Sequence, residues 1–214
     1  MSKQNNLTAP IIACARHRMQ SDGKGITTLV LFHGCPLRCR WCVNSFSLSC
    51  DTKTYHLTPQ ELYDKISIDN LYFLATGGGV TFGGGEPLLY PDYIAEFTKA
   101  CPKEWNICVE TSLSVPWENI EKVACCVDMF YIDCKDVDPE IYYNYTGKSN
   151  ELFLENIKKL LQIVPSEKIT VRIPLIPQFN TTENQQNSRA YFENLGITQF
   201  DLFDYFIPDE ENSQ

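Results

Sequence analysis

The chain has 214 residues, 43% hydrophobic and 21% charged, which suits one globular domain and argues against a disordered chain. Its 18 Lys and Arg residues against 27 Asp and Glu residues give a net charge of −9, a poor match for a nucleic-acid-binding protein, which needs a basic face. No apolar run reaches the roughly 20 residues of a membrane span, and the polar start lacks the pattern of a signal peptide.

We therefore expect a cytoplasmic protein with no nucleic-acid partner and no membrane partner. A single domain is expected over residues 1–214, with a polar tail at about residues 1–8 and an acidic tail at about residues 208–214.

Apolar and amphipathic runs alternate along the chain. Strands are predicted at residues 27–32, 80–82, 106–110, 129–133, 169–173 and 200–206. Helices are predicted from Thr58 onward and at residues 91–101, 118–124, 150–163 and 183–194. Residues 33–50 have little periodicity and are expected to form a loop. Six strands interleaved with helices predict parallel β-α units, as an open sheet or a barrel, with the active site at the carboxyl ends of the strands.

The sharpest motif follows the first predicted strand, where Cys35, Cys39 and Cys42 have the spacing C-x3-C-x2-C. A structural zinc site needs four ligands, whereas three cysteines on a [4Fe–4S] cluster leave one iron open to a substrate or cofactor. A fourth ligand from Cys50 or His33 would instead make a zinc site, and a redox disulfide is a further alternative.

The other seven of the ten cysteines have no cluster spacing. A secreted disulfide framework fits badly, because the chain shows no export signal and is long enough to bury its own core. We expect these seven to be buried thiols: Cys14, Cys50, Cys101, Cys108, Cys125, Cys126 and Cys134.

Polar residues follow several of the later strands. The Gly-Gly-Glu run at residues 84–86 lets the backbone approach a ligand closely, although a simple turn with Glu86 at a helix N-terminus is the alternative. Asp133 and Lys135 alternate on a strand, so both point to one side, where a zwitterionic amino acid or an internal ion pair would satisfy them. Arg172 suits a carboxylate ligand, or is an exposed strand residue.

Taken in order, these motifs resemble the radical S-adenosylmethionine superfamily and, more narrowly, the activating enzymes of glycyl radical enzymes. The resemblance covers residues 22 to about 184. It rests on residues 22–26 (DGKGI), 32–39 (FHGCPLRC), 77–87 (GGGVTFGGGEP), 131–135 (YIDCK), 146–150 (TGKSN) and 172–177 (RIPLIP).

The resemblance implies an α/β fold, a partial (β/α)6 barrel, in which Cys35, Cys39 and Cys42 hold a [4Fe–4S] cluster. It implies reductive cleavage of S-adenosylmethionine to a 5′-deoxyadenosyl radical that takes hydrogen from a glycine of a partner glycyl radical enzyme. A flavodoxin- or ferredoxin-type electron donor and anaerobic or microaerobic conditions are implied as well. The implied cofactor contacts are Trp41, Gly84, Gly85, Glu86, Thr111, Asp133, Lys135 and Arg172.

A monovalent cation beside the cofactor carboxylate is also implied, with Glu110, Thr111, Tyr131 and Asp133 as its ligands. Glu110, however, stands where the family has Asp. Four other positions or runs depart from the family pattern: Gly83 stands for Ser, Leu113 and Gln178 stand for Gly, and residues 44–46 stand for N-P-E. Phe206 stands for a His that can reach the cofactor ribose. The segment between Cys42 and Gly77 is too short for the ferredoxin-like insert of many relatives.

Two other functions stay open at this stage. The departures at Gly83, Gln178 and Phe206 favour a radical S-adenosylmethionine enzyme that acts on a small molecule, peptide or nucleotide. The alternative of another class is a non-catalytic Fe–S or zinc module for electron transfer or partner binding, which would not bind S-adenosylmethionine.

Overall fold

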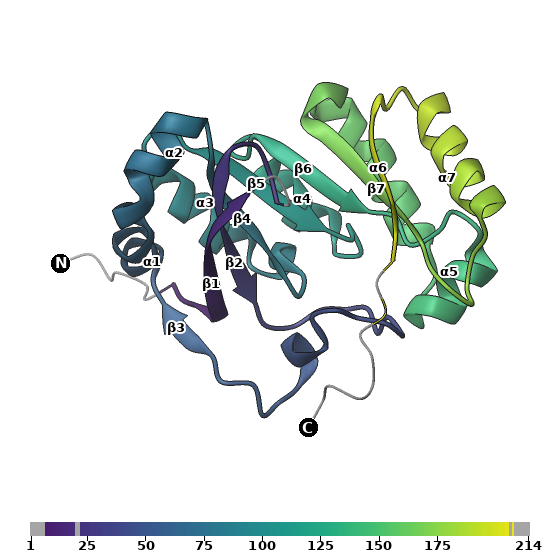
Figure 1. The fold of residues 1–214 in the computed structure, drawn as a ribbon, viewed down its shortest axis with the longest axis horizontal. Coiled ribbons are helices and arrows are strands. Elements are labelled where there is room, and N and C mark those ends of the chain that lie inside the picture. The colour runs from purple at the N-terminus through teal and green to yellow at the C-terminus, as the bar shows by residue number, and fades with distance from the viewer. Residues whose placement is uncertain (1–6, 20–21, 206, 208–214) are drawn as a thin grey trace.

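The computed structural model describes residues 7–19, 22–205 and 207. Within these residues one sheet of eight strands runs in the order β3-β1-β2-β4-β5-β6-β7-β8 (Figure 1). The strands are β1 (Ala9–Met19), β2 (Ile26–Phe32), β3 (Tyr55–Leu57), β4 (Gly79–Gly84), β5 (Asn106–Thr111), β6 (Met129–Asp133), β7 (Ile169–Leu175) and β8 (Gln199–Asp204).

Helices fill the connections between the strands. They are α1 (Pro59–Ile66), α2 (Asn70–Thr76), α3 (Pro91–Ala100), α4 (Trp117–Ala124), α5 (Pro139–Thr146), α6 (Glu151–Ile163) and α7 (Thr182–Asn194). Short 3-10 turns are η1 (Ser45–Leu48), η2 (Ser67–Asp69), η3 (Pro87–Leu89) and η4 (Ser166–Lys168). Among the described helices, none combines the length and the apolar character that crossing a bilayer requires.

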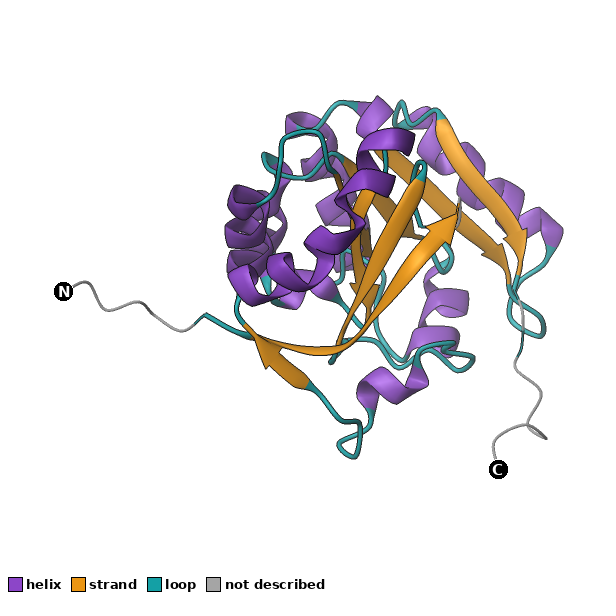
Figure 2. Cartoon of the chain, turned by 60° about the vertical axis from the view of Figure 1, so that its left-hand side comes forward, coloured by secondary structure: helices purple, strands orange, loops and turns teal. Residues whose placement is uncertain are grey.

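The predicted α/β class and its six parallel strands are confirmed. Strand β2 and strands β4 to β8 are paired in parallel, each with its neighbour. The sheet is open, since β3 and β8 lie at its two ends, so it forms a partial barrel. Figures 1 and 2 show helices covering one side of the curved sheet, and α3, α4 and α6 lie behind the strands in Figure 1.

Two strands, β1 and β3, and two helices, α2 and α5, were not predicted. Strand β1 pairs antiparallel with both β2 and β3, and its register shifts twice. Its second half carries Arg16, His17 and Arg18, and His17 has a positive φ of 57°, so the apolar alternation that marks a strand is lost there. The last strand ends at Asp204, and Phe206 lies outside the described residues.

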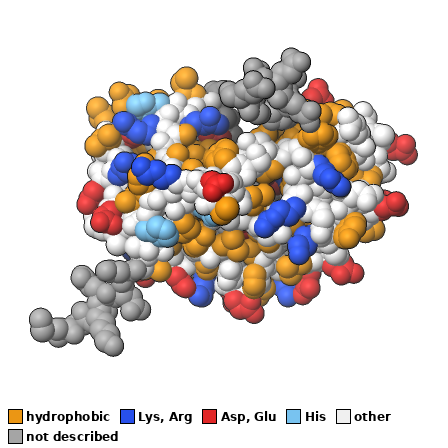
Figure 3. Space-filling view, turned by 90° about the horizontal axis from the view of Figure 1, so that it is seen from below, with side chains coloured by type: hydrophobic (Ala, Val, Ile, Leu, Met, Phe, Trp, Pro, Cys, Tyr) orange, Lys and Arg blue, Asp and Glu red, His pale blue; other side chains and the backbone are white. Residues whose placement is uncertain are grey.

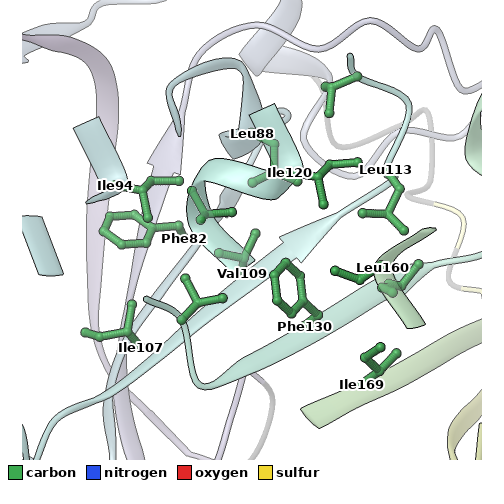
Figure 4. Packing of buried hydrophobic residues seen from close by; sticks show 14 of the residues in the cluster. Phe82, Leu88, Ile94, Ile107, Val109, Leu113, Ile120, Phe130, Leu160 and Ile169 are labelled. Carbon is green, nitrogen blue, oxygen red and sulfur yellow. The ribbon is translucent and has the colours of Figure 1, made fainter. Parts of the chain in front are cut away.

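The main core lies between the sheet and these helices. Phe82, Val109 and Phe130 come from three adjacent strands and pack toward Ile120 of α4 and Leu160 of α6 (Figure 4). All five are fully buried, and each such side chain contributes about 1.5–3 kcal/mol. Successive side chains of a strand point to opposite faces of the sheet. The residues between these buried ones therefore lie on the concave face.

Two of the departures from the family pattern have left-handed backbone. Leu113 has φ 53° and Gln178 has φ 70°, the region that glycine adopts without strain. Leu113 is fully buried, and Asn156 Nδ2 donates to the carbonyl oxygens of Leu113 and Val115 over 2.8 Å each. This burial and bonding stabilise the turn after β5, whereas Gln178 is exposed.

Replacing Gln178 with glycine should stabilise the fold slightly. Left-handed backbone costs a non-glycine residue about 1 kcal/mol, and the greater freedom of glycine in the unfolded chain offsets only part of this gain. The control is Gln186→Gly on the exposed face of α7, which should lower the free energy of unfolding by about 1 kcal/mol. Urea unfolding measures both, and equal losses in the two variants would contradict the strain at Gln178.

Candidate functional site

A cavity lies where the carboxyl ends of β4, β5 and β6 meet the loop that follows β2. It is lined by Cys35, Leu37, Cys39, Asn44, Gly84, Gly85, Glu86, Glu110, Thr111, Ser112, Asp133 and Lys135. Six of the eight expected cofactor contacts are therefore together here, with two of the three motif cysteines. Trp41 instead lines a neighbouring pocket with Arg40, Asn144 and Phe179.

The cysteine loop, residues 33–44 with Cys35, Cys39 and Cys42, is fastened to two distant parts of the chain. The backbone amides of Arg38 and Arg40 donate to the last two carbonyl groups of α5, each over 3.0 Å. The hydroxyl of Tyr205, just after β8, donates to the carbonyl oxygen of Trp41. Figure 1 shows the loop running below the sheet from the end of β2 toward α5. These contacts hold the thiols over the carboxyl ends of the strands.

The three thiols of the motif lie close enough to affect each other. Burial and then the nearby Glu86 raise the pKa of Cys35 to about 12, and Cys39 and Cys42 add to the rise. Within residues 7–19, 22–205 and 207, no three His, Cys, Asp or Glu side chains are placed so that they could hold a single metal ion. A [4Fe–4S] cluster binds each thiolate at a different iron atom, so this donor set suits a cluster.

The alternative fourth ligands are placed elsewhere. His33 Nε2 lies 2.9 Å from the carbonyl oxygen of Ser49, and Cys50 is exposed. The expectation that all seven remaining cysteines are buried was wrong for Cys50 and Cys125, which lie in a surface loop and at the end of α4. Cys108 and Cys134 are buried, and the other three are partly buried.

The glycine turn after β4 packs directly on the cysteine loop. A Cβ on Gly85 would lie 2.1 Å from the carbonyl oxygen of Gly34, and one on Gly84 would lie 2.8 Å from Leu31 Cα. Asn44 Nδ2 donates to the Gly84 carbonyl over 3.0 Å. Glycine is thus required for the contact between turn and loop, which also leaves the backbone of the turn bare toward the cavity.

Glu86 is buried at the end of this turn, and four donors surround its carboxylate. Thr111 Oγ1 donates over 2.7 Å, Ser112 Oγ over 2.7 Å and the Ser112 amide over 2.9 Å. The amide of Leu88 donates over 3.2 Å and makes Glu86 the cap of η3. Burial raises the pKa of the Glu86 carboxyl, and the donors oppose the rise. The side chain therefore joins the end of β4 to the end of β5.

A chain of ion pairs crosses the concave face beside the cavity. Lys135 Nζ lies 3.1 Å from Asp133 Oδ2, which is the internal ion pair that the sequence left open, although Lys135 follows β6 and is not part of it. Arg172 Nη1 lies 2.7 Å from Glu110 Oε1, and Arg172 Nε lies 3.5 Å from Asp133 Oδ1. Burial raises the pKa of Glu110 to about 7, and Arg172 opposes this rise.

Comparisons with known proteins show the family to which the chain belongs. The model of the radical SAM superfamily matches residues 29–185. The chain is 33% identical to the pyruvate formate-lyase-activating enzyme of Clostridium pasteurianum, over 78% of this chain and 68% of that protein. It is 30% identical to the (2S)-3-sulfopropanediol dehydratase activating enzyme of Klebsiella oxytoca, over 80% of this chain and 73% of that protein.

The fold is also similar to that of a solved structure, SuiB of Streptococcus suis bound to S-adenosylmethionine, with a TM-score of 0.63 and 16% identity. That match covers 82% of this chain, which spans only 39% of the longer SuiB chain. The protein belongs to the radical SAM superfamily and, within it, to the activating enzymes of glycyl radical enzymes.

Replacing Glu86 with glutamine should destabilise the protein even before any cofactor binds. The amide has a single acceptor oxygen, so part of the donor set loses its partner, at a cost of about 2 kcal/mol. Glu121→Gln on the exposed face of α4 is the control and should change stability by less than about 0.5 kcal/mol. Urea unfolding without cofactor makes the comparison. Unchanged stability in Glu86→Gln would show that the fold does not need this carboxylate.

Proposed function

We propose that this chain activates a glycyl radical enzyme, with Cys35, Cys39 and Cys42 holding a [4Fe–4S] cluster and S-adenosylmethionine binding in the adjoining cavity. The observation that carries the proposal is the cavity itself. It brings together thiols from the loop after β2, bare backbone from the turn after β4, and charged side chains from the ends of β5 and β6.

The residues at the cavity fit these two groups. Three neighbouring thiols can ligate three irons and leave the fourth open. The glycine turn offers unshielded backbone, and Asp133, Lys135 and Arg172 offer charges that suit a zwitterionic amino acid. Within the described residues the buried Arg172 Nε has no hydrogen-bond partner, so it can donate to a ligand. The buried Trp41 Nε1 has no partner there either, but Trp41 lines the neighbouring pocket.

The cluster and S-adenosylmethionine, when bound, supply one-electron reductive cleavage that gives methionine and a 5′-deoxyadenosyl radical. The chain orients the cofactor. Backbone carbonyls of Gly84 and Gly85 can accept from its amino group, and Lys135 and Arg172 can donate to its carboxylate. The cysteine loop and the covered sheet restrict access of water. A glycine of the partner would give a hydrogen atom from its Cα to this radical, leaving a glycyl radical and 5′-deoxyadenosine. The absence of a Cβ would let the glycine backbone enter a narrow opening.

An acidic electron donor of the flavodoxin or ferredoxin type suits this end of the molecule. Arg38 and Arg40 are exposed on the cysteine loop, although the chain as a whole carries a charge of −9. Figure 3 shows Lys and Arg side chains spread over several places on this end, whereas most acidic side chains in view lie at its rim. Opposite charges on two partners speed their association and set its orientation.

A single radical SAM domain in the cytoplasm is part of the same proposal. One sheet and one continuous core extend from β1 to β8, and between the cysteine loop and β4 the chain forms only η1, β3, α1, η2 and α2.

Cys39→Ala should abolish both cluster binding and the formation of 5′-deoxyadenosine, because two cysteines are too few to hold the cluster. Cys125→Ala is the matched control, since Cys125 is exposed at the end of α4, and it should keep wild-type iron content and product. The measurement is iron content and 5′-deoxyadenosine after anaerobic reconstitution, reduction with dithionite and addition of S-adenosylmethionine. Full product from Cys39→Ala would overturn the cluster assignment.

Arg40→Glu should slow reduction of the cluster by flavodoxin several-fold at low salt, because it places a like charge where the acidic donor approaches. Lys103→Glu is the control, since this exposed residue lies between α3 and β5 at the opposite end of the sheet. Stopped-flow absorbance follows the cluster, and reduction by dithionite should be equal in all three proteins. Equal flavodoxin rates in both variants would place the donor elsewhere.

A further inference from the structure

The pair of Glu110 and Arg172 occupies the place that the family resemblance assigns to a monovalent cation. The Arg172 guanidinium lies between the carboxylates of Glu110 and Asp133, with the shortest distance, 2.7 Å, to Glu110 Oε1. The side chains of Arg172 and Glu110 are only 22% and 16% exposed, so solvent screens this pair weakly.

Gly83 provides the room that the longer Glu110 needs. A Cβ on Gly83 would lie 2.8 Å from Glu110 Oε2 and 3.2 Å from Leu29 Cδ1. Where the family pattern has Ser and Asp at these two positions, this chain has removed a side chain from β4 and added a methylene on β5. The two departures therefore compensate each other, and together they place the Glu110 carboxylate beside the Arg172 guanidinium.

Two of the other expected cation ligands, Thr111 and Asp133, are already engaged. Thr111 Oγ1 donates to Glu86 Oε1 over 2.7 Å and accepts from the Leu113 amide over 2.9 Å. Asp133 lies within 3.1 Å of Lys135 Nζ and faces Arg172 directly in the register of β6 and β7. Each carboxylate on this part of the concave face thus has a cationic side chain beside it. Among the described side chains at this place, an added monovalent cation would therefore find no carboxylate that lacks a cationic partner.

We propose that the Arg172 guanidinium, held by Glu110, replaces a bound monovalent cation, so that S-adenosylmethionine binds to this chain without Na⁺ or K⁺. The inference rests on the proposed function, because it concerns the site assigned there to the cofactor. A guanidinium can serve the carboxylate of the cofactor as a cation would, since it carries one positive charge and donates hydrogen bonds in a fixed fork.

The test measures the binding of S-adenosylmethionine to the reconstituted, unreduced wild-type protein by equilibrium dialysis. The buffers contain sodium, potassium or choline chloride at one ionic strength. We expect dissociation constants that agree within about twofold across the three salts. Binding at least about tenfold weaker in choline, restored by Na⁺ or K⁺, would overturn the inference and leave the proposed function standing. Absence of binding in every salt would overturn both.

A double variant, Gly83→Ser with Glu110→Asp, tests whether the Glu110–Arg172 pair is the reason that binding needs no cation. It shortens the carboxylate, fills the space beside it and so withdraws it from Arg172. We expect this variant to bind S-adenosylmethionine about tenfold more tightly in Na⁺ or K⁺ than in choline. Thermal unfolding checks that it is folded. Equal binding in all three salts by the folded variant would show that the Glu110–Arg172 pair is not what makes the cation dispensable.

Discussion

The alternation of side chains along β4 to β7 is the constraint on which the rest of the molecule depends. Phe82, Val109 and Phe130 are fully buried among the helices, and the residues between them must face the other way. A slip of one residue in β5, β6 or β7 would bring Glu110, Asp133 or Arg172 into the apolar core. The free energy gained by burying the core side chains sets the register of the strands. That register places Glu110 and Arg172 together on the concave face.

The cysteine loop depends on the same sheet in a less direct way. It has little regular structure, and its position follows from contacts with α5, with Tyr205 and with the glycine turn after β4. These partners are distant in sequence, and each is set by the parallel order of the strands. A loop fastened at several points can hold ligands in a fixed geometry without a rigid element of its own.

Much of this arrangement could be predicted from the sequence, for a physical reason. The parallel strands are short runs rich in apolar residues, and all six were recognised between their helices. Strand β1 was missed because its second half carries Arg16, His17 and Arg18 and does not show that pattern. The ordered motifs identified Gly84 to Glu86 and Asp133, but they gave no sign of Ser112 or Asn44, whose roles arise only when the chain is folded.

The departures from the family pattern bear on the choice of substrate. In the sequence, Gly83 and Gln178 favoured a substrate other than a glycyl radical enzyme. In the structure, Gly83 makes room for Glu110, and Gln178 keeps the left-handed backbone of the glycine that it replaces. Both departures thus have explanations within the fold. Exposed apolar side chains follow the motif cysteines along the chain, since Val43 and Phe46 are 53% and 42% exposed. Apolar side chains of this kind, next to Arg38 and Arg40, suit the surface of a folded protein better than a small polar molecule.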